Sequence, residues 1–336
     1  MCESNSVNLA QIATFKGSEM KKVAISIGDI NGVGLEIALS AHNDISKIIK
    51  PIYFVDLSVF ECAAKILKMP IPRDFEVREI SPFCSQSVCE SIKQNTLIRP
   101  AQVTKESGEY SFVSFKNALH CVERGEMDAI LTLPINKFAW KCADIDFIGH
   151  TEFLRAHFGG GIMMLGCDEM FVALFTDHIP LGAVCERIKF NALRDFLLNF
   201  HAHFGFESAL VLGLNPHAGD SGILGSEDEI IQNALDWANK ALGAEIYKGV
   251  VAPDSAFRVQ NRKRFKVFVA MYHDQGLSVL KALYAEKSIN VTLGIPILRV
   301  SVEHGTGFDI AYKGIARAES YMEAVRFIAN QSNSQI

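Results

Sequence analysis

The stretch AMYHDQGLSVLKAL, residues 270–283, limits the possible folds more than any other part of the sequence. An apolar run of strand length stops at a histidine, and a helical pattern follows at once. The order of strand, short turn and helix also opens the chain at residues 21–39 and recurs at residues 51–68. Strands that alternate with helices predict an α/β protein with a mostly parallel sheet, because parallel neighbours need a crossover that is usually helical.

The other expected elements follow from the same hydrophobic periods. We expect further strands at residues 128–134, 209–215, 267–272, 289–294 and 297–302, and helices at residues 108–125, 190–204, 226–242 and 318–330. Residues 161–176 are expected to form a hairpin that turns near residues 167–169. Residues 70–107 are expected to be irregular, and residues 1–19 are expected to be a flexible N-terminal extension.

Histidines follow three of the expected strands. His178, His217 and His273 come just after them, and Asp177 and Asp274 stand beside two of these histidines. Ligand sites in α/β sheets gather beyond the carboxyl ends of strands, and imidazole is a common ligand of divalent ions. We therefore expect the three histidines to bind one metal ion, with the two aspartates orienting them. The alternative is that each histidine only makes a hydrogen bond in its own loop.

One glycine-rich segment lies between the first strand and the first helix. In GDINGVG, residues 28–34, the glycines do not follow the dinucleotide-binding pattern. We favour a tight turn there over an anion site at the helix N-terminus.

A second glycine-rich segment is EHGTGFDIAYKGIA, residues 303–316. It resembles the adenosine-binding loop of the isocitrate and isopropylmalate dehydrogenases, although Tyr312 stands where those enzymes have glycine. The resemblance implies that His304, Gly305 and Thr306 contact NAD(P) and that Asp309 approaches the adenine ribose. An ordinary glycine turn is the alternative.

Polar residues in apolar surroundings point to a small anionic ligand. Arg299 lies inside the strand-like PILRVSV, so it must meet a sheet edge, a partner or an anion. Lys281 and Arg299 together suit a phosphate, and Asn290 lies between them in the sequence. In FIGHTEFL, Thr151 is expected to cap a helix, which leaves His150 exposed as an anion contact. A purely capping Thr151 and a solvated Lys281 remain alternatives.

Composition excludes several other classes of protein. The net charge of −5 argues against a nucleic-acid binder, whose surface is normally basic. Eight cysteines occur without a CxxC pair, which favours free thiols in a reducing cytoplasm. Residues 1–19 lack the apolar centre of a signal peptide, and no apolar stretch is long enough to span a membrane. We expect a cytoplasmic protein that binds neither nucleic acid nor membrane.

Several motifs taken in order resemble one family. GHTEF, LNPHAG, MYHDQGL and NVTLG.P..R.SV.HGT occur as they do in the 4-hydroxythreonine-4-phosphate dehydrogenases, and the likeness extends over nearly the whole chain from Met20. The resemblance implies a metal-dependent oxidation of 4-phosphooxy-L-threonine by NAD(P). The product, 2-amino-3-oxo-4-phosphooxybutanoate, decarboxylates to 3-amino-2-oxopropyl phosphate in the biosynthesis of pyridoxine 5′-phosphate.

The resemblance also assigns roles to residues. It implies that the metal ligands are His178, His217 and His273, and that the substrate contacts are His150, Thr151, Lys281, Asn290 and Arg299. The ion is expected to be zinc, magnesium, cobalt or manganese. Asp254 is our candidate for the general base, and Lys281 is the second candidate.

The implied architecture is an isopropylmalate dehydrogenase-like fold with the active-site cleft between two domains. Residues 20–135 and 301–336 would form the cofactor-binding domain, and residues 136–300 would form the metal-binding and dimerisation domain. The resemblance implies a homodimer with its site at the subunit interface.

Two other functions remain open. The first is a related dehydrogenase acting on threonate or erythronate 4-phosphate. The second is a metal-dependent hydrolase, against which the adenosine-type loop argues.

Overall fold

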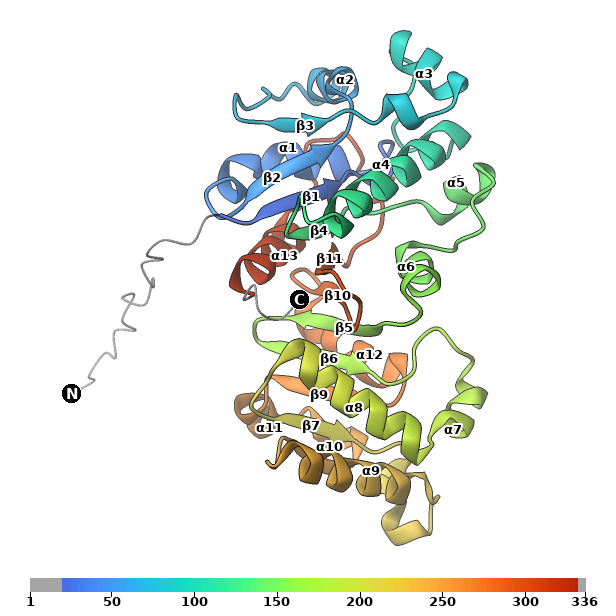
Figure 1. Ribbon diagram of the computed structural model, residues 1–336, viewed down its shortest axis with the longest axis vertical. Helices are drawn as coiled ribbons and strands as arrows, with labels where there is room; N and C mark the ends of the chain where they lie inside the picture. Colours follow the sequence, from blue (N-terminus) through green and yellow to red (C-terminus); the bar gives the residue numbers. More distant parts are fainter. Residues whose placement is uncertain (1–19, 332–336) are drawn as a thin grey trace, which may run out of the picture.

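The computed structural model describes residues 20–331, so the extension predicted at residues 1–19 lies outside the described part of the chain. The strands are β1 (Lys22–Ser26), β2 (Lys50–Phe54), β3 (Glu76–Arg78), β4 (Ala129–Thr132), β5 (Ile162–Cys167), β6 (Met170–Leu174), β7 (Ala209–Leu212), β8 (Tyr247–Val251), β9 (Val267–Ala270), β10 (Ile289–Leu293) and β11 (Arg299–Val302). Figure 1 shows them stacked along the long axis of the molecule, with helices in front and behind.

The helices are α1 (Gly34–Ile45), α2 (Leu57–Leu67), α3 (Gln86–Lys93), α4 (Lys105–Glu123), α5 (Lys137–Cys142), α6 (His150–Phe158), α7 (Val184–Arg187), α8 (Phe190–Phe204), α9 (Glu227–Leu242), α10 (Pro253–Ala256), α11 (Val259–Arg264), α12 (His273–Tyr284) and α13 (Glu319–Asn330). Short 3₁₀ helices are η1 (Ser81–Phe83), η2 (Leu181–Ala183) and η3 (Pro216–Gly222). None of the helices within residues 20–331 is long and apolar enough to cross a bilayer.

One sheet runs through the molecule in the order β3-β2-β1-β4-β11-β10-β5-β6-β9-β7-β8. Its outer strands pair in parallel, whereas β10 is antiparallel to both β11 and β5, and β5 is antiparallel to β6. The predicted α/β architecture with a mostly parallel sheet is therefore confirmed, as is the hairpin formed by β5 and β6. The division into two domains stays a prediction, since β10 and β11 continue the sheet across the predicted boundary.

Local sequence explains where α4 begins. The Thr104 hydroxyl accepts a hydrogen bond from the Ser107 amide at 3.0 Å and so caps the helix before the predicted start. Phe115, Leu119 and Val122 recur at helical spacing and are buried against the sheet.

Three segments differ from the sequence prediction. Residues 70–107 contain β3, η1 and α3, but α3 buries only Val88, so its apolar pattern is weak. The edge strand β8 was not predicted, because its half-buried residues include a lysine and a glycine. The strand predicted at residues 209–215 ends at Leu212. The Gly213 amide still donates to the Val251 carbonyl, and the Asp228 carboxylate accepts from the Leu214 and Asn215 amides that follow.

Neighbouring strands bring the candidate residues to one edge of the sheet. β6 is parallel to β9, and β9 is parallel to β7, so the segments that follow these strands emerge side by side. Thr176 donates its hydroxyl to the Met271 carbonyl at 2.6 Å and ties the end of β6 to the end of β9. Gln275 accepts from the Met271 amide and donates to the Gly213 carbonyl, both at 2.7 Å, which ties β9 to β7.

Candidate active site

Two of the three predicted metal ligands lie together at this edge. The ring centroids of His178, after β6, and His273, at the start of α12, are 5.7 Å apart. Nδ1 of His178 lies 3.2 Å from the Glu152 carboxylate, and Nδ1 of His273 lies 2.6 Å from the Asp274 carboxylate. Since a carboxylate only accepts hydrogen bonds, both Nδ1 atoms carry the proton and both Nε2 atoms are free to bind a metal ion.

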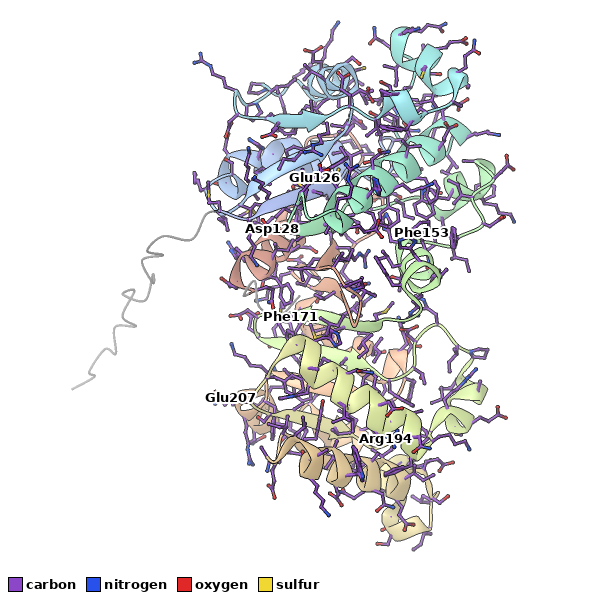
Figure 2. The ribbon with its side chains drawn as sticks, in the orientation of Figure 1. Glu126, Asp128, Phe153, Phe171, Arg194 and Glu207 are labelled. Atoms are coloured by element: carbon purple, nitrogen blue, oxygen red, sulfur yellow. The ribbon has the colours of Figure 1, made fainter. Side chains whose placement is uncertain are left out.

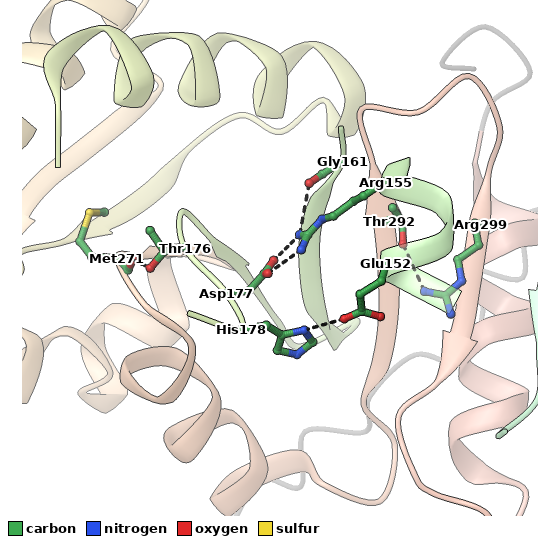
Figure 3. A network of polar contacts seen from close by, with 9 residues as sticks. All are labelled: Glu152, Arg155, Gly161, Thr176, Asp177, His178, Met271, Thr292 and Arg299. Atoms are coloured by element: carbon green, nitrogen blue, oxygen red, sulfur yellow. Dashed lines mark hydrogen bonds and ion pairs between the residues drawn. The ribbon is translucent and has the colours of Figure 1, made fainter. Parts of the chain in front are cut away.

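Glu152, and not the predicted Asp177, is the carboxylate that contacts the ring of His178. Both oxygens of the Asp177 carboxylate accept hydrogen bonds from Arg155, one of them at 2.6 Å, and Glu152 takes the place beside His178. Figure 3 shows the carboxylate of Glu152 between His178 and Arg299. The hydrogen bond from His178 lowers the pKa of Glu152, which keeps this carboxylate ionised at neutral pH.

His217 does not join the other two histidines within one chain. It is exposed, and it begins a run of left-handed backbone in η3 that continues to Ser221. Within residues 20–331, no cluster of three or more His, Cys, Asp or Glu side chains is spaced to hold a metal ion. The pair formed by His178 and His273 fits part of a metal site, and the full set of three ligands stays a prediction.

Arg299 is a buried cation at the centre of the sheet. Its side chain is 2% exposed and donates to the hydroxyls of Thr132 at 2.9 Å and Thr292 at 3.2 Å. Among the described residues no carboxylate forms an ion pair with it, and its Nε has no hydrogen-bond partner. Burial lowers the pKa of Arg299 to about 10, partly offset by the charge of Glu152, so the guanidinium is still charged at neutral pH.

The prediction of an exposed His150 behind a Thr151 cap is wrong. Helix α6 begins at His150, with Gly149 as its N-cap, and His150 is 8% exposed. Its ring packs against Phe115 and Trp140, and its Nε2 has no partner within residues 20–331. Burial, and next the charge of Arg299, hold the pKa of His150 well below its usual value, so the ring is neutral.

The other predicted substrate contacts have different surroundings, and no contact joins them directly to Arg299 within residues 20–331. Thr151 is 8% exposed, and the side-chain oxygen of Asn290 is buried without a hydrogen-bond partner among the described residues. The Nζ of Lys281 lies 2.7 Å from the carboxylate of Glu303, a partner that was not predicted from the sequence. Glu303 directly follows β11 and opens the predicted cofactor loop, so a charged residue beside that motif was the available signal.

The two glycine-rich segments pack against each other. The Val33 amide donates to the Thr306 carbonyl at 2.9 Å, and a Cβ at Gly32 would stand only 2.5 Å from that oxygen. His304, Gly305 and Asp309 remain exposed, and the space beside Gly305 is open. Exposed polar groups on an anchored loop are compatible with dinucleotide binding. The contact between these residues and NAD(P) stays a prediction.

Asp254 lies apart from the Arg299 region. It is exposed in the short helix α10, which packs against η3 and hence near His217. A hollow of about 780 Å³ lies at the opposite, amino-terminal ends of the strands, where Phe171 and Glu207 line it. Figure 2 shows these two residues on the opposite side of the view from Phe153 of α6. None of the predicted site residues lines this hollow within the described chain.

Known proteins resemble this chain over almost its whole length. The family model described as "Pyridoxal phosphate biosynthetic protein PdxA" matches residues 47–328. The 4-hydroxythreonine-4-phosphate dehydrogenase of Campylobacter fetus is 48% identical over 310 residues, which are 92% of this chain and 97% of that protein. The enzyme of the same name from Helicobacter pylori is 44% identical over 311 residues, which are 92% of this chain and 99% of that protein.

Solved structures agree with these relatives. The crystal structure of a 4-hydroxythreonine-4-phosphate dehydrogenase from Burkholderia phymatum has a TM-score of 0.74 and 28% identity, and the match covers 93% of this chain and 98% of that one. The Klebsiella pneumoniae structure of the same name also has a TM-score of 0.74, with 26% identity and 93% and 99% of the two chains covered. The chain therefore belongs to the family of 4-hydroxythreonine-4-phosphate dehydrogenases, oxidoreductases of pyridoxal phosphate biosynthesis.

Proposed function

We propose that the chain oxidises 4-phosphooxy-L-threonine with NAD(P) in a divalent-metal-dependent reaction in the cytoplasm. The carbon that bears the free hydroxyl becomes a ketone, which gives 2-amino-3-oxo-4-phosphooxybutanoate. This β-keto acid loses CO₂ and yields 3-amino-2-oxopropyl phosphate. The names of relatives that match almost the whole chain support this assignment.

The buried guanidinium of Arg299 is the observation that carries the proposal. Burying a charge without a counter-ion costs several kcal/mol, so a fold that keeps it gains from an anion brought by a ligand. A phosphate group meets this need, because its oxygens accept parallel hydrogen bonds from a guanidinium. Unpartnered polar atoms on His150 and Asn290 support a polar ligand at the same place.

The residues around Arg299 would share the work of binding and orienting the substrate. Thr151 and Asn290 would add hydrogen bonds to the phosphate, and Lys281 would add a second positive charge when it leaves Glu303. The neutral ring of His150 would offer Nε2 as an acceptor, or as a donor in the other tautomer. Fixing the phosphate in this way holds the reacting carbon in place and lowers the entropic part of the barrier.

His178 and His273 would hold the metal ion, with His217 as the third ligand. When bound, a divalent ion supplies positive charge that makes the substrate hydroxyl easier to deprotonate and eases decarboxylation. Zinc, magnesium, cobalt and manganese all suit an open site of this kind. The exposed groups of His304, Gly305 and Asp309, with Thr306 beneath them, would bind NAD(P).

The positions of His217 and Asp254 support a homodimer with shared sites. Both residues lie on packed elements away from Arg299, so we propose that they serve the site of a second copy. Asp254 would then remain the first candidate for the general base. Lys281 stays the second candidate, because its ammonium group already contacts the Glu303 carboxylate.

The test is the formation of NAD(P)H from 4-phosphooxy-L-threonine by the purified protein. Activity is expected to vanish after chelation and to return with zinc, magnesium, cobalt or manganese. Faster turnover of threonate or erythronate 4-phosphate would move the substrate assignment to that alternative. Release of phosphate without NAD(P)H would instead indicate a metal-dependent hydrolase.

A further inference from the structure

We infer that Glu152 is a positioning residue that holds the imidazole of His178 with Nε2 facing the site. Glu152 touches neither the reacting atoms nor the cofactor in this role, because it acts through His178. The inference rests on the metal site of the proposed function, and it concerns a side chain to which neither motif nor resemblance assigned a task.

The backbone at His178 is strained and needs support. Its φ is +42°, in the left-handed region that non-glycine residues seldom adopt. Such a conformation persists only where the surroundings enforce it. Helix α6 supplies two contacts to this strand end, since Arg155 binds Asp177 and Glu152 binds His178. Glu152 and Arg155 are three residues apart in α6, so the same face of the helix reaches both Asp177 and His178.

The contact with Glu152 decides which nitrogen of His178 is free. The distance from Nδ1 to the Glu152 carboxylate is 3.2 Å, and this oxygen can only accept. The neighbouring Asp177 instead accepts from Arg155 through both of its oxygens, and the hydrogen bond of His178 goes to Glu152. Glu152 is therefore the acceptor that fixes the Nδ1–H tautomer of His178 within the described chain.

The surroundings of Glu152 fix its carboxylate in turn. Both its second oxygen and the Lys137 side chain lie within 4 Å of the place where a Cβ at Gly149 would stand, so glycine leaves the room that Glu152 occupies. Arg299 lies on the far side, as Figure 3 shows. Three cationic or protonatable groups, those of His178, Lys137 and Arg299, thus surround one carboxylate.

The first measurement needs no metal. Nitrogen-15 histidine spectra of the full-length apo protein report the tautomer of each ring, and a His178→Gln variant identifies the signal. We expect the Nδ1–H tautomer of His178 in the unsubstituted protein at a pH where the ring is neutral. Glu152→Ala should lose it, whereas Glu152→Gln should keep it, since the amide oxygen still accepts. An unchanged tautomer in Glu152→Ala, with thermal unfolding also unchanged, overturns the inference.

The second measurement is the dissociation constant for zinc or cobalt by calorimetry. Glu152→Ala should bind at least about ten-fold more weakly, and Glu152→Gln should recover most of the loss, as expected for a residue that orients a ligand. Glu123→Ala is the matched control, because the Glu123 carboxylate contacts His157 at 2.5 Å on the exposed surface of α4 and α6. If Glu152→Ala and Glu152→Gln weaken metal binding equally, the orienting role is overturned, and only the negative charge of Glu152 matters for metal affinity.

The two measurements separate this inference from the proposed function. If the unsubstituted protein binds no divalent ion but its His178 tautomer depends on Glu152, the metal proposal fails and the positioning role stands. If it binds metal and the tautomer ignores Glu152, the positioning role fails alone.

Discussion

Arg299 occupies a position that lowers the stability of the free protein. Its guanidinium is buried in the middle of the sheet and donates to two threonine hydroxyls, so most of its hydration is lost without an ion pair, and the charge of Glu152 offsets only part of the cost. Sites that bind a charged ligand commonly keep such a cost, because removing it would also remove affinity. Stability and substrate binding should therefore respond in opposite directions when this residue changes.

Arg299→Met tests this opposition. The variant should be more stable than the unsubstituted protein by about 1 kcal/mol or more, since an apolar side chain of similar length fills the place of an unpaired charge. Thermal and urea unfolding give the comparison. Inorganic phosphate should raise the melting temperature of the unsubstituted protein but not that of Arg299→Met. A variant that is both less stable and still stabilised by phosphate would assign Arg299 a structural role.

Arg299→Lys tests the geometry of the same contact. Lysine keeps the charge but cannot form two parallel hydrogen bonds to one phosphate. The KM for 4-phosphooxy-L-threonine should rise roughly ten-fold if ~1.4 kcal/mol of binding is lost. The KM for NAD should stay constant, because residues 303–316, the predicted cofactor loop, begin beyond the end of β11. Unchanged substrate kinetics would argue against the phosphate assignment.

Asp29 is expected to make stability depend on pH. Burial raises the pKa of Asp29 to about 6 from 3.8, although hydrogen bonds from Asn31 and Ser107 lower it. Between these values the unfolded chain loses the proton first, so the unfolding free energy falls as pH rises, by about 3 kcal/mol in total. Asp29→Asn should remove this loss. Urea unfolding at about pH 4 and pH 7 gives the change in unfolding free energy with pH for each protein. The same change in both proteins would show that Asp29 titrates normally.

The segment at residues 303–316 depends on the turn at residues 28–34 for its shape. Gly32 lets the two backbones approach, and the Ala316 amide donates to the buried Glu36 at 2.7 Å. Tyr312 has a φ of 60° and donates its hydroxyl to the Ile30 carbonyl at 2.6 Å. A tyrosine in the left-handed region is unfavourable by itself, so this hydrogen bond and the packing of the ring offset the backbone cost.

Tyr312→Phe should loosen the loop at residues 303–316. The Ile30 carbonyl would lose its partner, which costs about 1 kcal/mol. If the loop binds NAD(P), the KM for the dinucleotide should rise about five-fold. Steady-state kinetics with each substrate varied in turn provide the internal control, because the KM for 4-phosphooxy-L-threonine should not change. A rise in that KM alone would place the loop at the substrate instead.

The sequence allowed prediction of elements whose burial follows a regular period, and it failed where side-chain contacts decide. The helix at residues 190–204 was predicted with both ends correct, since Leu193, Leu197 and Phe200 recur on its buried face. The start of α6 was misplaced because extended backbone at Gly149 caps the helix without a side chain. Glu303 was missed as the partner of Lys281, because 22 positions in the sequence separate two residues that only the fold brings together.

At the scale of the whole molecule, one chain brings together two of the three predicted metal ligands. His178 and His273 meet at the ends of β6 and β9, while His217 lies in η3 beyond β7. In a closed symmetric dimer, any contact that one copy makes with its partner is made in return by the partner. This arrangement would let each subunit complete the site of its partner, and it leads to a test in mixtures.

Complementation between two inactive variants provides that test. His217→Ala and His273→Ala should each be inactive as homodimers. After mixing under conditions that exchange subunits, about a quarter of the sites should regain a full set of ligands if His217 acts across the interface. Activity in the mixture and a dimer mass in sedimentation are the measurements. A monomer with full activity, or a mixture that stays inactive despite exchange, would contradict the shared site.

The order of strands also governs how the protein can be made by a ribosome. β10 and β11 come late in the sequence, yet they fill the centre of the sheet between β5 and β4. Until they emerge, β4 and β5 present open edges, which favour pairing with other nascent chains. The sheet therefore closes only near the end of translation, and a message cut short before residue 289 yields two unjoined groups of strands instead of a shortened enzyme.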